Sequence, residues 1–104
     1  MTEHLTIHRR TIGVTDRQSF TEPGYVHRLL SVAPVRQPNL AEVAIDVWFE
    51  VYPGSPSATR VDVSVVGTGN PIPENTPFHH IGTVVTPAGM VWHVYADTEY
   101  GTPQ

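Results

Sequence analysis

Apolar side chains recur at every second position along much of this chain. The clearest run spans residues 43–52, where every odd position carries Val, Ile or Phe. A second run spans 61–66, with Val at 61, 63 and 65. Alternation with a period of two places apolar side chains on one face of a β-strand. Both segments are therefore predicted to be strands, and the turn-forming residues 53–58 between them predict a hairpin.

Weaker alternation predicts four more strands and leaves little room for helix. The strands are expected at 5–12, 25–35, 81–86 and 90–96, with Pro34 ending the second or placing it at an edge. Residues 14–24 are expected to form a loop with a short strand at 18–20, residues 36–42 a second loop, and residues 97–104 a frayed tail. Ten prolines restrict any helix to one short turn. The sequence predicts an all-β fold in a single domain, 1–104, as a compact antiparallel sheet of about six strands, either sandwich-like or a small open barrel.

The last hairpin allows a prediction of register. Thr86-Pro87-Ala88-Gly89 suits a type I turn followed by a left-handed glycine. This three-residue loop pairs Val84 with Trp92 and Gly82 with Val94. A two-residue loop would shift the pairing by one residue and change which side chains share a face. We prefer the three-residue loop, because it explains Gly89.

Composition excludes several classes of function. The chain has 104 residues, six Arg, no Lys and a formal net charge of −4, which argues against nucleic-acid binding and against a basic membrane patch. It has no Cys, which excludes disulfides, thiolate catalysis and Cys-ligated metals. No apolar run approaches the roughly 18 residues of a membrane-spanning helix, and the N-terminus lacks the apolar region of a signal peptide. We therefore expect a cytoplasmic protein.

The most unusual stretch is Gly67-Thr68-Gly69-Asn70-Pro71. Closely spaced glycines let backbone N–H groups approach an anion, so one hypothesis is a ligand-binding loop. The stretch does not match a dinucleotide fingerprint, because Ile72 stands where the third Gly belongs. The simpler interpretation, which we favour, is a strand that ends in a bend where Gly supplies a positive φ.

The six histidines raise the question of a metal site. His79 and His80 are adjacent, so on a strand they point to opposite faces and cannot hold one ion together. His80 and His93 share a face only in the two-residue-loop register, where they lie about 7–8 Å apart on a diagonal. Without a His-x-x-x-His pair to support them, we expect no metal and no cofactor.

Catalytic and aromatic clusters have structural alternatives. No Gly-x-Ser-x-Gly elbow is present, and we expect no catalytic residues and no enzyme. Asp46, Glu50 and Asp62 are predicted on neighbouring strands, where exposed polar alternation explains them without acid–base chemistry. The aromatic set Trp48, Tyr25, Tyr52 and Tyr100 would form a binding surface if exposed, and Trp48 would equally suit a second buried layer.

Several motifs together resemble a small uncharacterised protein family that is widespread in bacteriophages of actinobacteria. They are Asp46-Val47-Trp48-Phe49, Val65-Val66-Gly67-Thr68-Gly69-Asn70-Pro71-Ile72-Pro73, Ile81-Gly82-Thr83-Val84, Gly89-Met90-Val91-Trp92-His93-Val94-Tyr95 and the early Val14-Thr15-Asp16-Arg17-Gln18. The Gly-Thr-Gly-x-Pro loop combined with Trp-His is the most specific part. The family often has His where this chain has Asn70, and residues 36–42 are longer than usual. The resemblance implies a phage origin and a compact β fold, and it assigns no activity.

The resulting expectation is a non-catalytic phage accessory protein that binds a host or defence protein, or a small signalling ligand, in the host cytoplasm. The alternatives are a virion component, such as a decoration or tail-accessory domain, and a small metal-dependent or hydrolytic enzyme using His80 or His93. A homo-oligomer is expected, in the simplest case a two-fold dimer through a strand edge or the Trp48 face. The expected binding residues are Gly67, Thr68, Gly69, Asn70, His79, His80, His93, Arg28 and Trp48.

Overall fold

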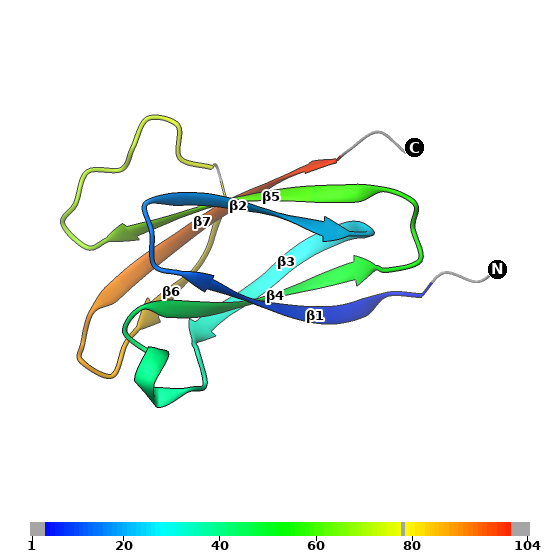
Figure 1. The fold of residues 1–104 in the computed structure, drawn as a ribbon. Coiled ribbons are helices and arrows are strands. Elements are labelled where there is room, and N and C mark those ends of the chain that lie inside the picture. Colours follow the sequence, from blue (N-terminus) through cyan, green and yellow to red (C-terminus); the bar gives the residue numbers. More distant parts are fainter. Residues whose placement is uncertain (1–3, 78, 101–104) are drawn as a thin grey trace.

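Seven strands and one short 3-10 turn make up the chain in a computed structural model that describes residues 4–77 and 79–100 (Figure 1). The elements are β1 (Thr6–Gly13), β2 (Arg17–Pro23), β3 (Tyr25–Pro34), η1 (Pro38–Leu40), β4 (Ala44–Tyr52), β5 (Ala58–Gly67), β6 (His79–Val85) and β7 (Val91–Tyr100). The predicted all-β class with a single helical turn is therefore confirmed. Within the described ranges, no helix is long and apolar enough to cross a membrane.

The strands form two antiparallel sheets that do not close into a barrel. One sheet has the order β1-β4-β3 and the other β2-β5-β7-β6. The predicted hairpin of β4 and β5 is wrong, because the connector carries the chain from one sheet to the other (Figure 1). The inward face of β4 is wholly apolar and that of β5 is apolar except for Thr59, and the two faces bury each other across the core rather than lying side by side.

The core lies between the sheets, and seven of its twelve buried members come from the two alternating runs. Its buried members are Ile12, Val26, Ile45, Val47, Phe49, Val51, Val61, Val63, Val65, Val84, Val94 and Ala96. Phe49 is the largest fully buried side chain. The alternation therefore predicted the inward faces correctly for residues 45–51 and 61–65, but it is wrong for Val43, which lies in the turn before β4 and is 59 % exposed.

Two segments are more regular than predicted. The short strand expected at 18–20 is part of the seven-residue β2, which pairs with β5. Residues 97–100 were expected to belong to a frayed tail, and this is wrong, because they continue β7 opposite residues 59–62 of β5. These residues show no apolar alternation that would predict a strand. They form one because β5 is long enough to provide hydrogen-bond partners for their backbone. Residues 101–104 lie outside the described part.

The hairpin of β6 and β7 has the predicted register. Val84 lies opposite Trp92 and Gly82 opposite Val94. Gly89 has a φ of 88°, and its N–H donates to the carbonyl of Thr86 at 2.9 Å. The register shifts between His80 and Gly82, so that Ile81 has no residue opposite it. This bulge reverses the faces of the residues that precede it.

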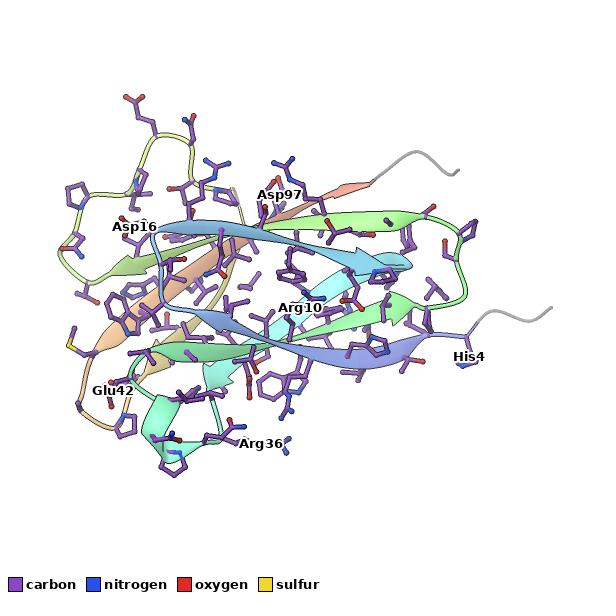
Figure 2. All side chains as sticks on the ribbon, in the orientation of Figure 1. His4, Arg10, Asp16, Arg36, Glu42 and Asp97 are labelled. Carbon is purple, nitrogen blue, oxygen red and sulfur yellow. The ribbon has the colours of Figure 1, made fainter. Side chains whose placement is uncertain are left out.

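The edges of the two sheets approach each other differently on the two sides of the sandwich. Between β1 and β2, Arg10 and His8 both contact the carboxylate of Glu22, and Arg10 lies in the space between these strands (Figure 2). On the opposite side β3 lies directly on β6. A Cβ added at Gly82 would lie 2.6 Å from Cγ2 of Val32, so only glycine permits this approach without a shift of β3.

Candidate functional site

A cleft of about 430 Å³ opens beside the contact of Val32 with Gly82. It lies between residues 28–30 of β3 on one side, and residues 79–81 of β6 and 96–98 of β7 on the other. The two edge strands touch at Val32 and Gly82 and separate toward their N-terminal ends (Figure 1). The cleft therefore lies where the edges of the two sheets diverge from their contact at Val32 and Gly82.

The lining of the cleft is apolar with a few polar groups. Leu29, Leu30, Ile81 and Ala96 supply the apolar surface. The polar side chains are Arg28, His79, His80, Asp97 and Thr98, of which Asp97 is labelled in Figure 2. A mainly apolar cavity of a few hundred Å³ with a small number of polar groups is typical of small-molecule sites.

Arg28 is held in place by Glu50 of the neighbouring strand β4. Arg28 Nε donates to Glu50 Oε1 at 2.7 Å and Nη2 donates to Oε2 at 3.4 Å. The hydrogen bond from Arg28 is the main reason why the pKa of Glu50 lies below its ordinary value, and the same bond raises the pKa of Arg28. Two nitrogens of the guanidinium are thus fixed, and Nη1 makes no contact with Glu50.

The bulge at Ile81 brings His80 onto the same face as His93. Thr83 Oγ1 lies 3.3 Å from His80 Nε2 and 3.1 Å from His93 Nδ1. The two imidazole centroids are 6.1 Å apart, and His80 also contacts the ring of Tyr95. The expectation that His80 and His93 share a face only with a two-residue loop is therefore wrong, because an extra residue in β6 has the same effect.

Thr68 extends this group of side chains to the glycine-rich stretch. Its Oγ1 lies 2.8 Å from Nε2 of His93, so the chain Thr68–His93–Thr83–His80 is continuous. We call these four residues the histidine relay. The stretch itself is a bend after β5 in which Gly69 has a φ of 89°, as predicted. Its possible role as a ligand-binding loop stays a prediction.

A second, smaller cavity lies beside this bend. It has a volume of about 60 Å³, and Gly67, Asn70 and Trp92 contribute to its lining. Asn70 donates its N–H to the carbonyl of Gly67 at 3.1 Å, which closes the turn. The indole N–H of Trp92 is buried without a hydrogen-bond partner in the described chain. A few water molecules would fill this volume, so the bend offers much less room than the cleft.

The expected binding residues thus fall into three places. Arg28, His79 and His80 line the cleft, and His80 also begins the histidine relay that ends at Thr68. Gly67, Gly69 and Asn70 form the bend. Trp48 lies apart on β4, half-buried opposite Arg9 of β1. Use of this Trp48 face for dimerisation stays a prediction.

The carboxylates are arranged differently from the prediction. Asp62 is on β5 and so belongs to the other sheet from Asp46 and Glu50. Asp46 is not exposed, because only 1 % of its side-chain surface is accessible to solvent. Its Oδ1 accepts a hydrogen bond from Thr11 Oγ1 at 2.5 Å. Arg9 Nη1 is its nearest cation, 3.9 Å from Oδ2. Asp46 is thus a buried structural carboxylate rather than part of an exposed polar face.

Sequence reasoning missed several residues of the site. Thr83 links the two histidines, and Leu29, Leu30, Ile81 and Asp97 shape the cleft. Ile81 and Thr83 belong to the motif Ile81-Gly82-Thr83-Val84, which gave them no role, whereas Leu29, Leu30 and Asp97 belong to no motif, because edges of different sheets bring them together. In residues 4–77 and 79–100, no three His, Asp or Glu side chains converge in a way that suits a metal ion.

Comparison with known proteins gives a family and nothing beyond it. A family model described as a domain of unknown function (DUF7352) matches residues 3–103. No curated protein and no solved structure matches the chain.

Proposed function

Since the chain belongs to the DUF7352 family of uncharacterised domains, whose model matches residues 3–103, we propose a function from the site alone: a binding domain that holds a small ligand in the cleft between β3 and β6. The cleft itself carries this proposal. Its volume suits a small molecule, and Arg28, His79 and His80 come together there from distant parts of the chain. A flat protein-binding surface would need none of these features.

The biological setting that we propose is that of a non-catalytic accessory protein of a bacteriophage. The resemblance of the Gly-Thr-Gly-x-Pro and Trp-His motifs to a phage family supports this setting. A small acidic domain with a ligand cleft would suit the capture of a small signalling molecule in an infected cell.

A substitution that fills the cleft tests the proposal. Ile81 is half-buried in the cleft lining, so Ile81→Trp is expected to occupy the cavity. We expect molecules that the wild-type protein retains from a bacterial metabolite extract to be lost by this variant, as measured by mass spectrometry of the bound fraction. Val85→Trp is the matched control, because Val85 lies on the same strand, is exposed and does not line the cleft.

The control should retain the same molecules as the wild type. Retention by Ile81→Trp equal to that of Val85→Trp would place the binding elsewhere and refute the proposal. So would a wild-type protein that retains nothing. Both variants are first compared with the wild type by circular dichroism, so that loss of binding is read only from folded protein.

Hydrolysis is the second candidate function, because one contact favours it. Thr68 Oγ1 lies within hydrogen-bond reach of His93 Nε2, and Thr83 contacts the other ring nitrogen. A hydroxyl, a base and a group that orients the base are the elements of nucleophilic catalysis. Here the orienting group is a neutral hydroxyl, which stabilises an imidazolium less than a carboxylate does.

A simple ester distinguishes hydrolysis from binding. We expect the wild-type protein to cleave p-nitrophenyl acetate no faster than Thr68→Ala, because the proposed function needs no nucleophile. The release of nitrophenolate is measured over time at equal protein concentrations. A wild-type rate that falls to the solvent background in both Thr68→Ala and His93→Gln would instead establish the hydrolytic function.

A further inference from the structure

The charges around the cleft are nearly balanced when its histidines are neutral. Arg28 contributes one positive charge, which Glu50 offsets at 2.7 Å. Asp97 adds a negative charge, and His79 Nδ1 lies 3.8 Å from its Oδ1. With neutral imidazoles, Arg28, Glu50 and Asp97 sum to one net negative charge. An anion would therefore enter this cleft favourably only if a histidine gained a proton.

The hydrogen-bond donors of the cleft nevertheless suit an anion. Arg28 donates hydrogen bonds to Glu50 from Nε and Nη2, while its Nη1 makes no hydrogen bond or ion pair with any described residue. Nε2 of His80 is hydrogen-bonded to Oγ1 of Thr83, and Nδ1 of His80 makes no hydrogen bond within the described chain. A fixed guanidinium and an imidazolium are the donors that carboxylates and phosphates prefer.

The histidine relay gives His80 a place for the additional proton. When His80 is charged, Nε2–H donates to Thr83 Oγ1, and the Thr83 hydroxyl donates to His93 Nδ1. His93 remains neutral and donates its Nε2–H to Thr68 Oγ1. Every member of the histidine relay then has a hydrogen-bond partner within the relay, and Nδ1–H of His80 remains available to a ligand. A second proton, on Nδ1 of His93, would leave the Thr83 hydroxyl without an acceptor within the relay.

We propose that the cleft takes a small organic anion, a carboxylate or phosphate ester on an apolar body, and that this ligand binds together with one proton held by His80. The inference rests on the proposed function and deepens it by naming the ligand class. The apolar body contacts Leu30, Ile81 and their neighbours, while the anionic group lies between Arg28 and His80.

Other ionisable groups pack around His80 and must be considered. On β6 the neighbour is His79, and on β7 they are Tyr95, His93 and Asp97. From the other sheet, Arg28 of β3 lines the same cleft with Glu50 of β4 behind it. Arg17 of β2 and Asp62 of β5 lie further along the outer face, opposite Ser64 and Asp97 respectively. Among these side-chain types, histidine is the one whose unperturbed charge changes between about pH 5 and 8.

Three probes of similar size that share a phenyl ring test the charge of the ligand. Benzoate, benzyl alcohol and benzylamine are titrated into the wild-type protein, and amide shifts of the cleft residues are followed by NMR. We expect benzoate to bind most tightly, with an affinity that falls as the pH rises through the histidine range, by at most about tenfold per pH unit. Phenyl phosphate in a parallel titration shows which of the two anionic groups is preferred.

Two histidine variants, one inside the cleft and one outside it, test where the proton is held. Calorimetry in two buffers with different ionisation enthalpies should show about one proton taken up per benzoate. We expect His80→Gln to abolish this uptake and flatten the pH dependence. His4→Gln should keep both, because His4 precedes β1, is exposed and does not line the cleft.

The outcomes separate this inference from the proposed function. Binding of benzyl alcohol or benzylamine as tight as that of benzoate would keep the cleft as a binding site and overturn the anionic ligand. Proton uptake that persists in His80→Gln, or is lost in His4→Gln, would overturn the assignment to His80. If none of the probes shifts the cleft residues in the wild type, the proposed function fails and the inference with it.

Discussion

Replacing Gly24 by Ala should be one of the most damaging single changes in this protein. Gly24 joins β2 to β3 with a φ of 102°, a conformation that costs other residues roughly 1–2 kcal/mol. An added Cβ would also lie 2.6 Å from the carbonyl oxygen of Tyr52 and 3.1 Å from Cα of Pro53. Both neighbours are backbone, so relief requires the chain to move, at a further cost of roughly 1–3 kcal/mol.

The expected loss for Gly24→Ala is therefore about 2–5 kcal/mol in the free energy of unfolding. It is measured by urea denaturation, as a lower midpoint with an unchanged slope. Gly89→Ala is the matched control, because Gly89 has a similar φ of 88° and no atom within 4 Å of the added Cβ. Equal losses for the two variants would show that the close approach of Tyr52 and Pro53 contributes nothing.

The sequence predicted which side chains face inward, and it did not predict which strands are neighbours. The alternation that places Val47 and Phe49 on one face would be the same in a hairpin and in a sandwich. What decides between them is the path of residues 53–57 and their contact with Gly24, whose N–H donates to the carbonyl of Ser57. A contact between positions 33 residues apart leaves no local pattern in the sequence.

The candidate site was predictable only in part, for a similar reason. The chemistry of Arg28, His79, His80 and His93 was visible as residue types, but their grouping depends on a bulge at Ile81. A single extra residue in a strand reverses the faces on one side of it, and the one local signal here is Gly82 directly after it, because a glycine inside a strand often marks a bulge. Thr83 was therefore missed, although it joins the two histidines.

The shape of the cleft depends on how β3 is fixed at two points. Near the beginning of β3, the backbone N–H of Val26 donates a hydrogen bond to the hydroxyl of Thr59 in the other sheet. Further along β3, Val32 packs on Gly82 of β6. Between these points the pairing of β3 with β4 shifts twice, at His27 and at Leu30. The two extra residues make β3 longer than the matching part of β4, so we expect β3 to bend at residues 28–30, beside the cleft. A cleft fixed in this way exists before a ligand arrives, which favours binding.

Thr59→Val should weaken the first of these two points and strongly destabilise the protein. The Thr59 side chain is fully buried, and its hydroxyl accepts the N–H of Val26 and donates to the carbonyl of Gly24, both at 3.0 Å. Valine has the same shape without the hydroxyl, so two buried backbone groups lose this partner, at roughly 1–3 kcal/mol each. We expect a loss of about 2–6 kcal/mol in urea denaturation.

Thr59→Ser distinguishes these hydrogen bonds from packing, because serine keeps the hydroxyl and removes only a methyl group. Its expected cost is about 1 kcal/mol, close to that of one buried CH₂. A serine variant less stable than the valine variant would mean that the methyl contacts hold the sheets together and the hydroxyl does not. With the expected order, the hydroxyl of Thr59 joins the two sheets where β3 begins, and loss of this bond should also broaden the NMR signals of residues 28–30 beside the cleft.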